Sequence, residues 1–274
     1  MREYFDRDTR ISRTRLVYFA VVDGSPAAHS MSTVTLDSPA CQIGTFVKTG
    51  SPQIIEILGG AGLHFAVIDA EHAPFDRALV DIMVMAARSV GMPLFIRIPD
   101  HQPATIQSAL DLGISGLLVP HVDSVEQARA VVARTRFIGG ERGFSSSPRF
   151  AGYGALGMRK AVEAGEGIPV ICQIESRAGC DAAREIVAVD GVAGLFVGRA
   201  DLALSFGLTD ARAPDVMSAT VDVLDLTRKA GKIAGVALGD IKEIDEFTAM
   251  GATWFVVGSD QSLLRKGALA LMGA

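Results

Sequence analysis

Short apolar runs alternate with amphipathic segments from Gln42 to the end of the chain. Eight runs have the nearly continuous apolar character of buried parallel strands, and each is followed by a segment with helical periodicity. The predicted strands are residues 42–47, 65–69, 94–98, 116–120, 169–175, 194–198, 232–237 and 253–258. The predicted helices are 52–62, 76–90, 103–112, 124–136, 178–188, 214–230, 240–250 and a last one from about residue 261.

This alternation predicts an α/β fold, a closed (β/α)8 TIM barrel. Parallel strands that are apolar on both faces need a covering layer of helices, and eight of them can close on themselves. The length of 274 residues fits one such barrel. An open doubly wound sheet is the alternative, but no GxGxxG motif follows the first strand. We assign residues 41–274 to a single barrel domain.

Residues 1–40 lack this alternation. Arg10, Arg13 and Arg15 precede a short apolar run, LVYFAVV, which has some likeness to the apolar part of a signal peptide. The run is short and no clear A-x-A cleavage site follows it. We therefore expect an N-terminal extension, either a poorly ordered arm or sequence upstream of a protein that starts at Met31.

Composition narrows the class of partner. The net charge is −5 and no basic cluster occurs beyond the amino terminus, which argues against a nucleic-acid surface. No apolar run approaches the ~18–20 residues of a membrane helix. Cys41, Cys172 and Cys180 lack CxxC or Cys/His metal spacing, so we expect reduced thiols and a cytoplasmic protein, with Cys172 pointing into packing. Small molecules are the expected partners.

One connection is long, residues 138–166 between the fourth and fifth strands. Its sequence is rich in glycine and serine. Connections of this length within a barrel are commonly lids or binding loops, or else disordered. We expect a functional loop.

Charged and polar side chains follow the carboxyl ends of several predicted strands, where barrel enzymes have their active sites. Core packing does not require them there, and burying them unpaired would be costly. The period of two along a strand places Gln173 and Glu175 on one face and turns Arg97 inward. The side chains that meet at this rim are Asp69, Glu71, His72, Arg97, Gln173, Glu175 and Asp201.

Four of these residues have two interpretations each. Glu175 and Asp201 suit a hard cation such as Mg²⁺, or they are acids in the first turn of a helix. His72, three residues after Asp69, can share a proton with it as a general base, or it is a loop histidine bonded to backbone. Arg97 can clamp a carboxylate or an oxyanion, or it can form an ion pair that holds Asp69 or Glu71.

Six segments carry a family resemblance. Residues 42–264 resemble the HpcH/HpaI aldolase family of metal-dependent pyruvate aldolases, which includes 4-hydroxy-2-oxoheptanedioate aldolase and 2-dehydro-3-deoxyglucarate aldolase and has a barrel of the phosphoenolpyruvate/pyruvate type. The motifs occur on five strands in the expected order. They are IDAEHAP at 68–74, FIRIP at 95–99, ALDLGISGLLVPHVDS at 109–124, GERG at 140–143, QIES at 173–176 and GRADLALSFG at 198–207.

The resemblance implies a class II aldolase that cleaves a 4-hydroxy-2-oxo acid to pyruvate and an aldehyde through a metal-stabilised pyruvate enolate. It implies that Glu175 and Asp201 bind the divalent metal, Mg²⁺ or else Mn²⁺ or Co²⁺. It also implies a homo-oligomer, commonly a hexamer, with the last helix packed on a neighbour. The other implied roles are keto-oxygen binding for Arg97, a base dyad of Asp69 and His72, and substrate binding for Gln173 and the backbone of Ala200 and Asp201.

The chain departs from the family pattern at three places, which bear on the aldehyde more than on the chemistry. Arg199 replaces the proline of a Gly-Pro-Ala-Asp segment, residues 137–140 replace a Tyr-Pro-Pro segment, and Lys48-Thr49-Gly50 differs after the first strand. We place Glu71 and Lys48 on the substrate side, where Lys48 would meet the distal carboxylate or hydroxyls of the aldehyde portion. Lys48 is also the only lysine near a strand end that a Schiff-base aldolase could use.

Two other functions stay open. One is a lyase acting on an acyl-CoA thioester, like the citrate lyase β-like relatives, which would need a basic groove for the CoA phosphates. The other is a non-catalytic barrel that binds an oxo acid. The complete set of acids, histidine and arginine argues against the second.

Overall fold

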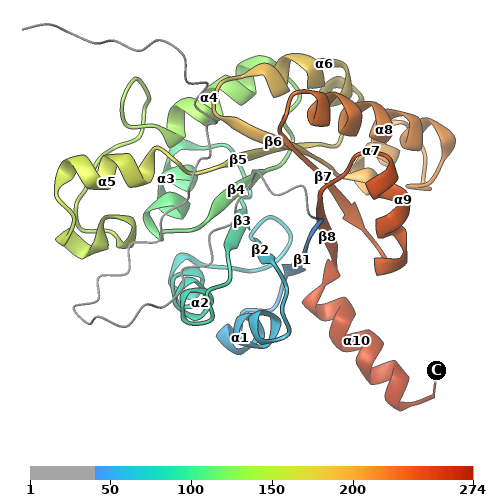
Figure 1. Ribbon diagram of the computed structural model, residues 1–274, viewed down its shortest axis with the longest axis horizontal. Helices are drawn as coiled ribbons and strands as arrows, with labels where there is room; N and C mark the ends of the chain where they lie inside the picture. The colour runs from blue at the N-terminus through green and yellow to red at the C-terminus, as the bar shows by residue number, and fades with distance from the viewer. Residues whose placement is uncertain (1–40, 274) are drawn as a thin grey trace, which may run out of the picture.

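The computed structural model describes residues 41–273, which form a closed barrel of eight parallel strands (Figure 1). Each strand pairs with the next along the chain, and β8 pairs with β1 to close the barrel. The predicted TIM barrel is therefore confirmed, whereas the expected extension at 1–40 lies outside the described residues. The strands are β1 (Gln42–Val47), β2 (Phe65–Asp69), β3 (Leu94–Arg97), β4 (Gly116–Val119), β5 (Val170–Ile174), β6 (Val192–Val197), β7 (Ile233–Leu238) and β8 (Trp254–Ser259).

Helices follow the strands as the periodicity predicts. Asp76, Ser124, Ser176 and Ser259 cap four of them by accepting hydrogen bonds from backbone N–H groups in the first turn. The predicted helices are α1 (Pro52–Gly60), α2 (Arg77–Ser89), α3 (Pro103–Asp111), α4 (Val125–Thr135), α6 (Arg177–Ala188), α8 (Pro214–Lys229), α9 (Ile244–Ala249, preceded by the 3-10 turn η2, Ile241–Glu243) and α10 (Asp260–Leu271). Two more, α5 (Met158–Gly165) and α7 (Arg199–Ser205), were not predicted.

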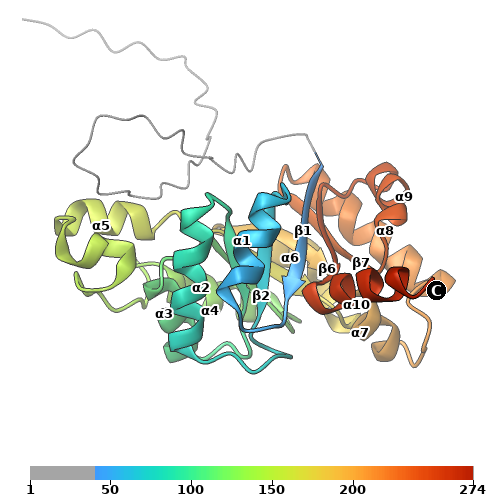
Figure 2. The same cartoon turned by 90° about the horizontal axis from the view of Figure 1, so that it is seen from below.

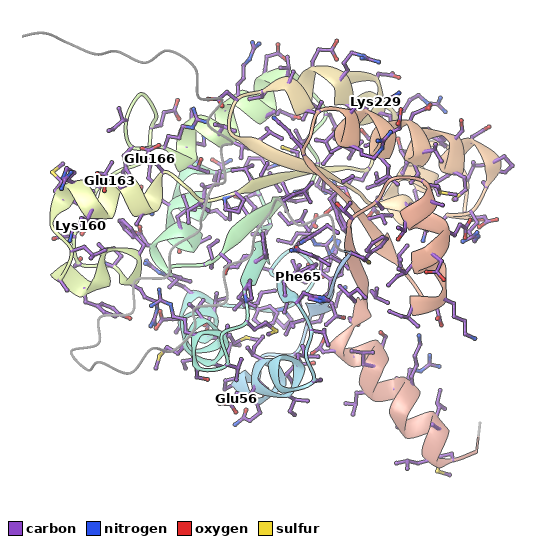
Figure 3. The ribbon with its side chains drawn as sticks, in the orientation of Figure 1. Glu56, Phe65, Lys160, Glu163, Glu166 and Lys229 are labelled. Atoms are coloured by element: carbon purple, nitrogen blue, oxygen red, sulfur yellow. The ribbon has the colours of Figure 1, made fainter. Side chains whose placement is uncertain are left out.

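Aromatic rings pack together inside the barrel. Phe65, labelled at the centre of Figure 3, stacks on Trp254 with ring centroids 4.1 Å apart. Phe95 and Phe196 meet the same indole edge-on. Gly44 gives the rings room, because a Cβ there would lie 2.4 Å from the Phe65 ring. These rings thus fill the barrel interior, and a cluster of charged side chains lies at the carboxyl ends of the strands.

The outer core lies between the strands and the helices. Cys172 is fully buried there, as its position in β5 predicts. Burial raises the pKa of its thiol to about 12, so the group is not a nucleophile at neutral pH. No helix in residues 41–273 combines the length and apolarity needed to cross a membrane.

The long connection 138–166 contains two short helical segments, and its expected functional role stays a prediction. It folds into the 3-10 turn η1 (Arg149–Gly154) and α5, which lies at the edge of the molecule in both views (Figures 1 and 2). Arg149 joins it to α2 through an ion pair of 2.6 Å with Asp81. An apolar cluster of its own holds it together, made of Phe137, Phe150, Ala151, Leu156 and Ala161.

The last helix, α10, extends away from the barrel (Figure 1). Its apolar side chains are exposed, with Leu264 at 77% and Leu271 at 88%. Asp260 is its one buried residue among those the structure describes. A helix with this composition and so little burial needs a covering surface to be stable in water.

Candidate active site

Arg97 and Asp69 form the centre of the polar rim. They are partners in the register of β2 and β3 and both point into the barrel. Arg97 Nε donates to Asp69 Oδ1 at 3.0 Å and Nη2 donates to Oδ2 at 2.7 Å. The guanidinium also lies over the Phe46 ring, 4.5 Å from its centroid. This buried fork fixes the plane of the arginine.

Lys48 contacts the same carboxylate. Its Nζ lies 3.0 Å from Asp69 Oδ2, and the side chain is 28% exposed. Lys48 is expected to face the rim, and its ammonium group contacts Asp69 there. Burial by itself would raise the pKa of Asp69, but hydrogen bonds and charge from Arg97, with the Lys48 and His72 bonds, hold that pKa below its usual value.

His72 does not form the predicted side-chain pair with Asp69. Its backbone N–H donates to Asp69 Oδ1 at 3.1 Å, while its imidazole Nε2 lies 3.6 Å from Glu71 Oε2. The reason is that Arg97 and Lys48, from β3 and the end of β1, already occupy the Asp69 oxygens. The imidazole is half exposed and faces the rim from the loop after β2.

Glu71 links the arginine to a histidine that the sequence analysis did not select. Glu71 Oε2 lies 3.2 Å from Arg97 Nε, and Glu71 Oε1 lies 3.0 Å from His121 Nε2. The other ring nitrogen of His121, Nδ1, lies 2.9 Å from Glu175 Oε1, and its backbone N–H donates to the same oxygen at 2.7 Å. His121 directly follows Pro120 at the end of the fourth predicted strand, which was a signal the sequence offered.

The backbone conformation of His121 explains both contacts. Its φ of 52° lies in the left-handed region, which residues other than glycine seldom adopt. A strained backbone of this kind persists only where the surrounding contacts hold it in place, which is often at functional sites. Here it turns the ring and the amide of His121 together toward Glu175.

Glu175 and Gln173 lie side by side at the end of β5, as the strand periodicity predicts. Gln173 Nε2 donates to Glu175 Oε2, while the buried Gln173 Oε1 accepts no hydrogen bond from any residue in 41–273. Burial raises the pKa of Glu175, and the charge of Asp201 raises it further against the opposing His121 and Gln173 bonds. Gly198 makes room for this pair, because a Cβ there would lie 2.8 Å from Gln173 Nε2 and 3.0 Å from Glu175 Oε2.

Asp201 lies in the first turn of α7, the short helix that follows β6, and is exposed. No hydrogen bond within residues 41–273 uses the backbone N–H of Ala200 or Asp201, which are among the unpaired donors at a helix start. Arg199 turns away from the rim. Its guanidinium donates to Ala237 O and, at 2.9 Å, to Glu243 Oε2, so it joins α7 to η2.

The donor set fits a divalent cation. Four carboxyl groups (Asp69, Glu71, Glu175, Asp201) share the rim with the basic side chains of Lys48 and Arg97, so acidic groups outnumber the ammonium and guanidinium groups. Mg²⁺ takes only one or two carboxylates from a protein, its other ligands being water and substrate oxygens, so the acids of this rim are enough for one ion. No group of three His, Cys, Asp or Glu residues in 41–273 forms a complete protein cage, and such a site does not need one.

Comparison with known proteins decides the family. A sequence model of the HpcH/HpaI aldolase/citrate lyase family matches residues 42–267. The chain belongs to this family. It is 35% identical to the 5-keto-4-deoxy-D-glucarate aldolase of Klebsiella pneumoniae over 235 residues, which are 85% of this chain and 91% of that one. It is 39% identical to the hydroxypyruvate/pyruvate aldolase of Deinococcus radiodurans over 234 residues, 84% of each.

Solved structures agree with this assignment. A HpcH/HpaI aldolase/citrate lyase family protein from Burkholderia cenocepacia superposes with a TM-score of 0.82 at 34% identity, covering 87% of this chain and 96% of the other. A citrate lyase β subunit from M. tuberculosis superposes with a TM-score of 0.53 at 17% identity, which shows a shared fold alone. The expected family, barrel and carbon–carbon lyase class are thereby confirmed.

Proposed function

We propose that this protein is a metal-dependent, class II aldolase that cleaves a 4-hydroxy-2-oxo acid to pyruvate and an aldehyde. The observation that carries the proposal is one continuous polar network from Arg97 through Glu71 and His121 to Glu175. It joins a fixed guanidinium to the acid pair that suits a metal. The aldolase names of relatives at 35% and 39% identity support the same reaction class.

Glu175 and Asp201 would hold the metal, Mg²⁺ or else Mn²⁺ or Co²⁺. When bound, the ion supplies positive charge beside the carboxylate and keto oxygens of a 2-oxo acid. The buried, unpartnered Gln173 Oε1 supports the same position, because a buried acceptor of this kind needs a donor, such as an ordered water.

Arg97 would stabilise the enolate. Nε and Nη2 are committed to acids, and no hydrogen bond within residues 41–273 uses Nη1. This nitrogen can donate to the keto oxygen as negative charge develops there during cleavage of the C3–C4 bond. The free N–H groups of Ala200 and Asp201 and the Gln173 side chain would hold the substrate carboxylate.

His72 would take the proton from the C4 hydroxyl. As that proton leaves, the C4–O bond becomes a carbonyl and the C3–C4 electron pair passes into the enolate, which is then protonated at C3 to give pyruvate. Glu71 lies nearer to the imidazole than Asp69 does, so Glu71 is the acid that would orient it in this arrangement. Asp69 would act by holding Arg97 and Lys48.

The acyl-CoA lyase alternative has weaker support, because the citrate lyase structures share the fold alone while the aldolase relatives share a third of the sequence. The test is pyruvate release from a panel of 4-hydroxy-2-oxo acids, measured with lactate dehydrogenase, beside acetyl-CoA release from 3-hydroxyacyl-CoA thioesters, measured by mass spectrometry. We expect turnover of one or more oxo acids and none of the thioesters. Cleavage of the thioesters alone would overturn the proposal.

A homo-oligomer, a hexamer as the family resemblance implies, would cover α10. The exposed Leu263, Leu264, Leu269, Leu271 and Met272 support packing of this helix on a second copy. Light scattering at micromolar concentration tests this directly, since a monomer would contradict it.

The three cysteines have no disulfide, which supports the proposed cytoplasmic location.

A further inference from the structure

Asp260, the first residue of α10, holds the turn that carries Lys48. Its Oδ1 accepts a hydrogen bond from the backbone N–H of Lys48 at 2.8 Å, and its Oδ2 accepts one from Thr49 at 3.0 Å. The residue is 7% exposed. Lys48 in turn places its Nζ 3.0 Å from Asp69 Oδ2. A carboxylate distant in sequence thus orients the backbone from which a site lysine extends.

We propose that Asp260 is a positioning residue that sets the place of Lys48 in the active site, and through it the recognition of the aldehyde portion of the substrate. The expected effect of Asp260 on substrate recognition rests on the proposed function. Its expected effect on the ion pair between Lys48 and Asp69 does not rest on that function.

A carboxylate is the group that this turn requires. Lys48 and Thr49 lie beyond the ladder of β1 and before α1, so their amides have no partner in sheet or helix. Two oxygens can accept from two successive N–H groups at once. An asparagine would present an NH₂ group to one of these donors and lose that bond.

An alternative role for Asp260 would be to cap the N-terminus of α10. Other residues already fill that role. Ser259 caps the helix, accepting from the Ser262 N–H at 3.2 Å, while Ser262 Oγ accepts from the Ser259 N–H at 2.9 Å. Ser259 is thus a matched control: it lies at the same helix end, and among residues 41–273 its hydroxyl bonds to Ser262 and not to the Lys48 turn.

The first experiment measures how fast an amine reagent modifies Lys48 in the native protein, by peptide mass spectrometry, relative to the exposed Lys160. In the wild type the ion pair protects Lys48. Modification of Lys48 should be roughly tenfold faster in Asp260→Asn, because losing a hydrogen bond to a charged acceptor loosens the turn that carries this lysine. Ser259→Ala should match the wild type. An unchanged Lys48 rate in Asp260→Asn would overturn the proposal.

Asp260→Glu provides a second variant that keeps both carboxylate oxygens. It should restore most of the protection, and a Lys48 as reactive as in Asp260→Asn would count against the proposal. Thermal melting of each variant shows whether the barrel is folded before labelling.

The second experiment is a double-mutant cycle with Lys48→Met, using KM for an acidic acceptor aldehyde in the condensation direction. If Asp260 acts through Lys48, adding Asp260→Asn to Lys48→Met raises KM no further. Additive effects would show that Asp260 acts by another route. If the wild type proves to have no aldolase activity, the proposed function fails while the labelling result still decides the role of Asp260.

Discussion

Arg97 and Asp69 meet through two hydrogen bonds, Nε to Oδ1 and Nη2 to Oδ2, on neighbouring strands of the barrel. The pair is buried, with Asp69 at 0% and Arg97 at 6% exposure. Because both ends of the carboxylate are used, Asp69 acts as a support for the arginine. In the proposed mechanism the chemistry at the rim then depends on Arg97, Glu175 and the histidines.

The contribution of the Arg97–Asp69 pair to the free energy of unfolding should depend on pH. The pKa of Asp69 is lowered from its usual 3.8, so its ionised form stabilises the fold above that value, and the contribution is lost as pH falls through the lowered pKa. We expect Asp69→Asn to cost about 3–5 kcal/mol at pH 7, as for other broken buried pairs. Urea unfolding should show the difference shrinking below about pH 4. A difference that stays constant with pH would contradict this account.

Metal binding should depend on Glu175. Glu175→Gln removes the negative charge next to Asp201 while keeping the shape of the side chain. We expect Mn²⁺ affinity, measured by electron paramagnetic resonance, to fall roughly a hundredfold or more, beyond the loss seen for supporting residues. Glu56→Gln, an exposed position on α1, is the control and should bind as the wild type does. Equal Mn²⁺ affinities for all three proteins would exclude Glu175 as a ligand.

Gly198 should be intolerant of even a methyl group. A Cβ at this position would come within 3.0 Å of both Gln173 Nε2 and Glu175 Oε2, so the two side chains must shift. Gly198→Ala should lose about 1–3 kcal/mol of stability, as overpacking does, together with Mn²⁺ affinity. Gly60→Ala, where the added Cβ meets nothing within 4 Å, is the matched control. Normal metal binding by Gly198→Ala would show that Gln173 and Glu175 can shift without loss of metal affinity.

Substitution of His72 should affect one step of the reaction more than another, and His121 provides the comparison. If His72 is the base for the C4 hydroxyl, His72→Ala should slow aldol cleavage by ~10²-fold or more while affecting proton exchange at the pyruvate methyl group far less. His121→Ala, which changes the Glu71–Glu175 bridge, is the comparison. Equal losses of cleavage and exchange in His72→Ala would place His72 elsewhere in the mechanism.

Much of the barrel and half of the site follow from the sequence, because the periodicity of buried strands determines which side chains point inward. Arg97, Gln173 and Glu175 were predicted this way and lie where the period of two puts them. Residues just beyond a strand end are governed by other rules. His121 returns to Glu175 only because its φ is 52°, which no strand pattern predicts.

Competition between distant segments accounts for the other differences. The spacing of His72 and Asp69 permits a side-chain pair, but Arg97 and Lys48 reach the carboxylate from other strands. The connection 138–166 is rich in glycine and serine, yet apolar side chains of it, Phe150 and Leu156 among them, form a separate cluster with Phe137. The contact between Asp260 and the Lys48 turn spans the whole barrel sequence and has no local signal.

Exchange of the pyruvate methyl protons for deuterium, followed by proton NMR in D₂O, tests the central claim most directly because it needs no knowledge of the aldehyde. With Mg²⁺ present the wild type should exchange these protons, excess EDTA should stop the exchange, and added Mg²⁺ should restore it. Glu175→Gln should stay inactive throughout. Exchange that continues at an unchanged rate in excess EDTA would contradict the metal-dependent mechanism proposed for this site.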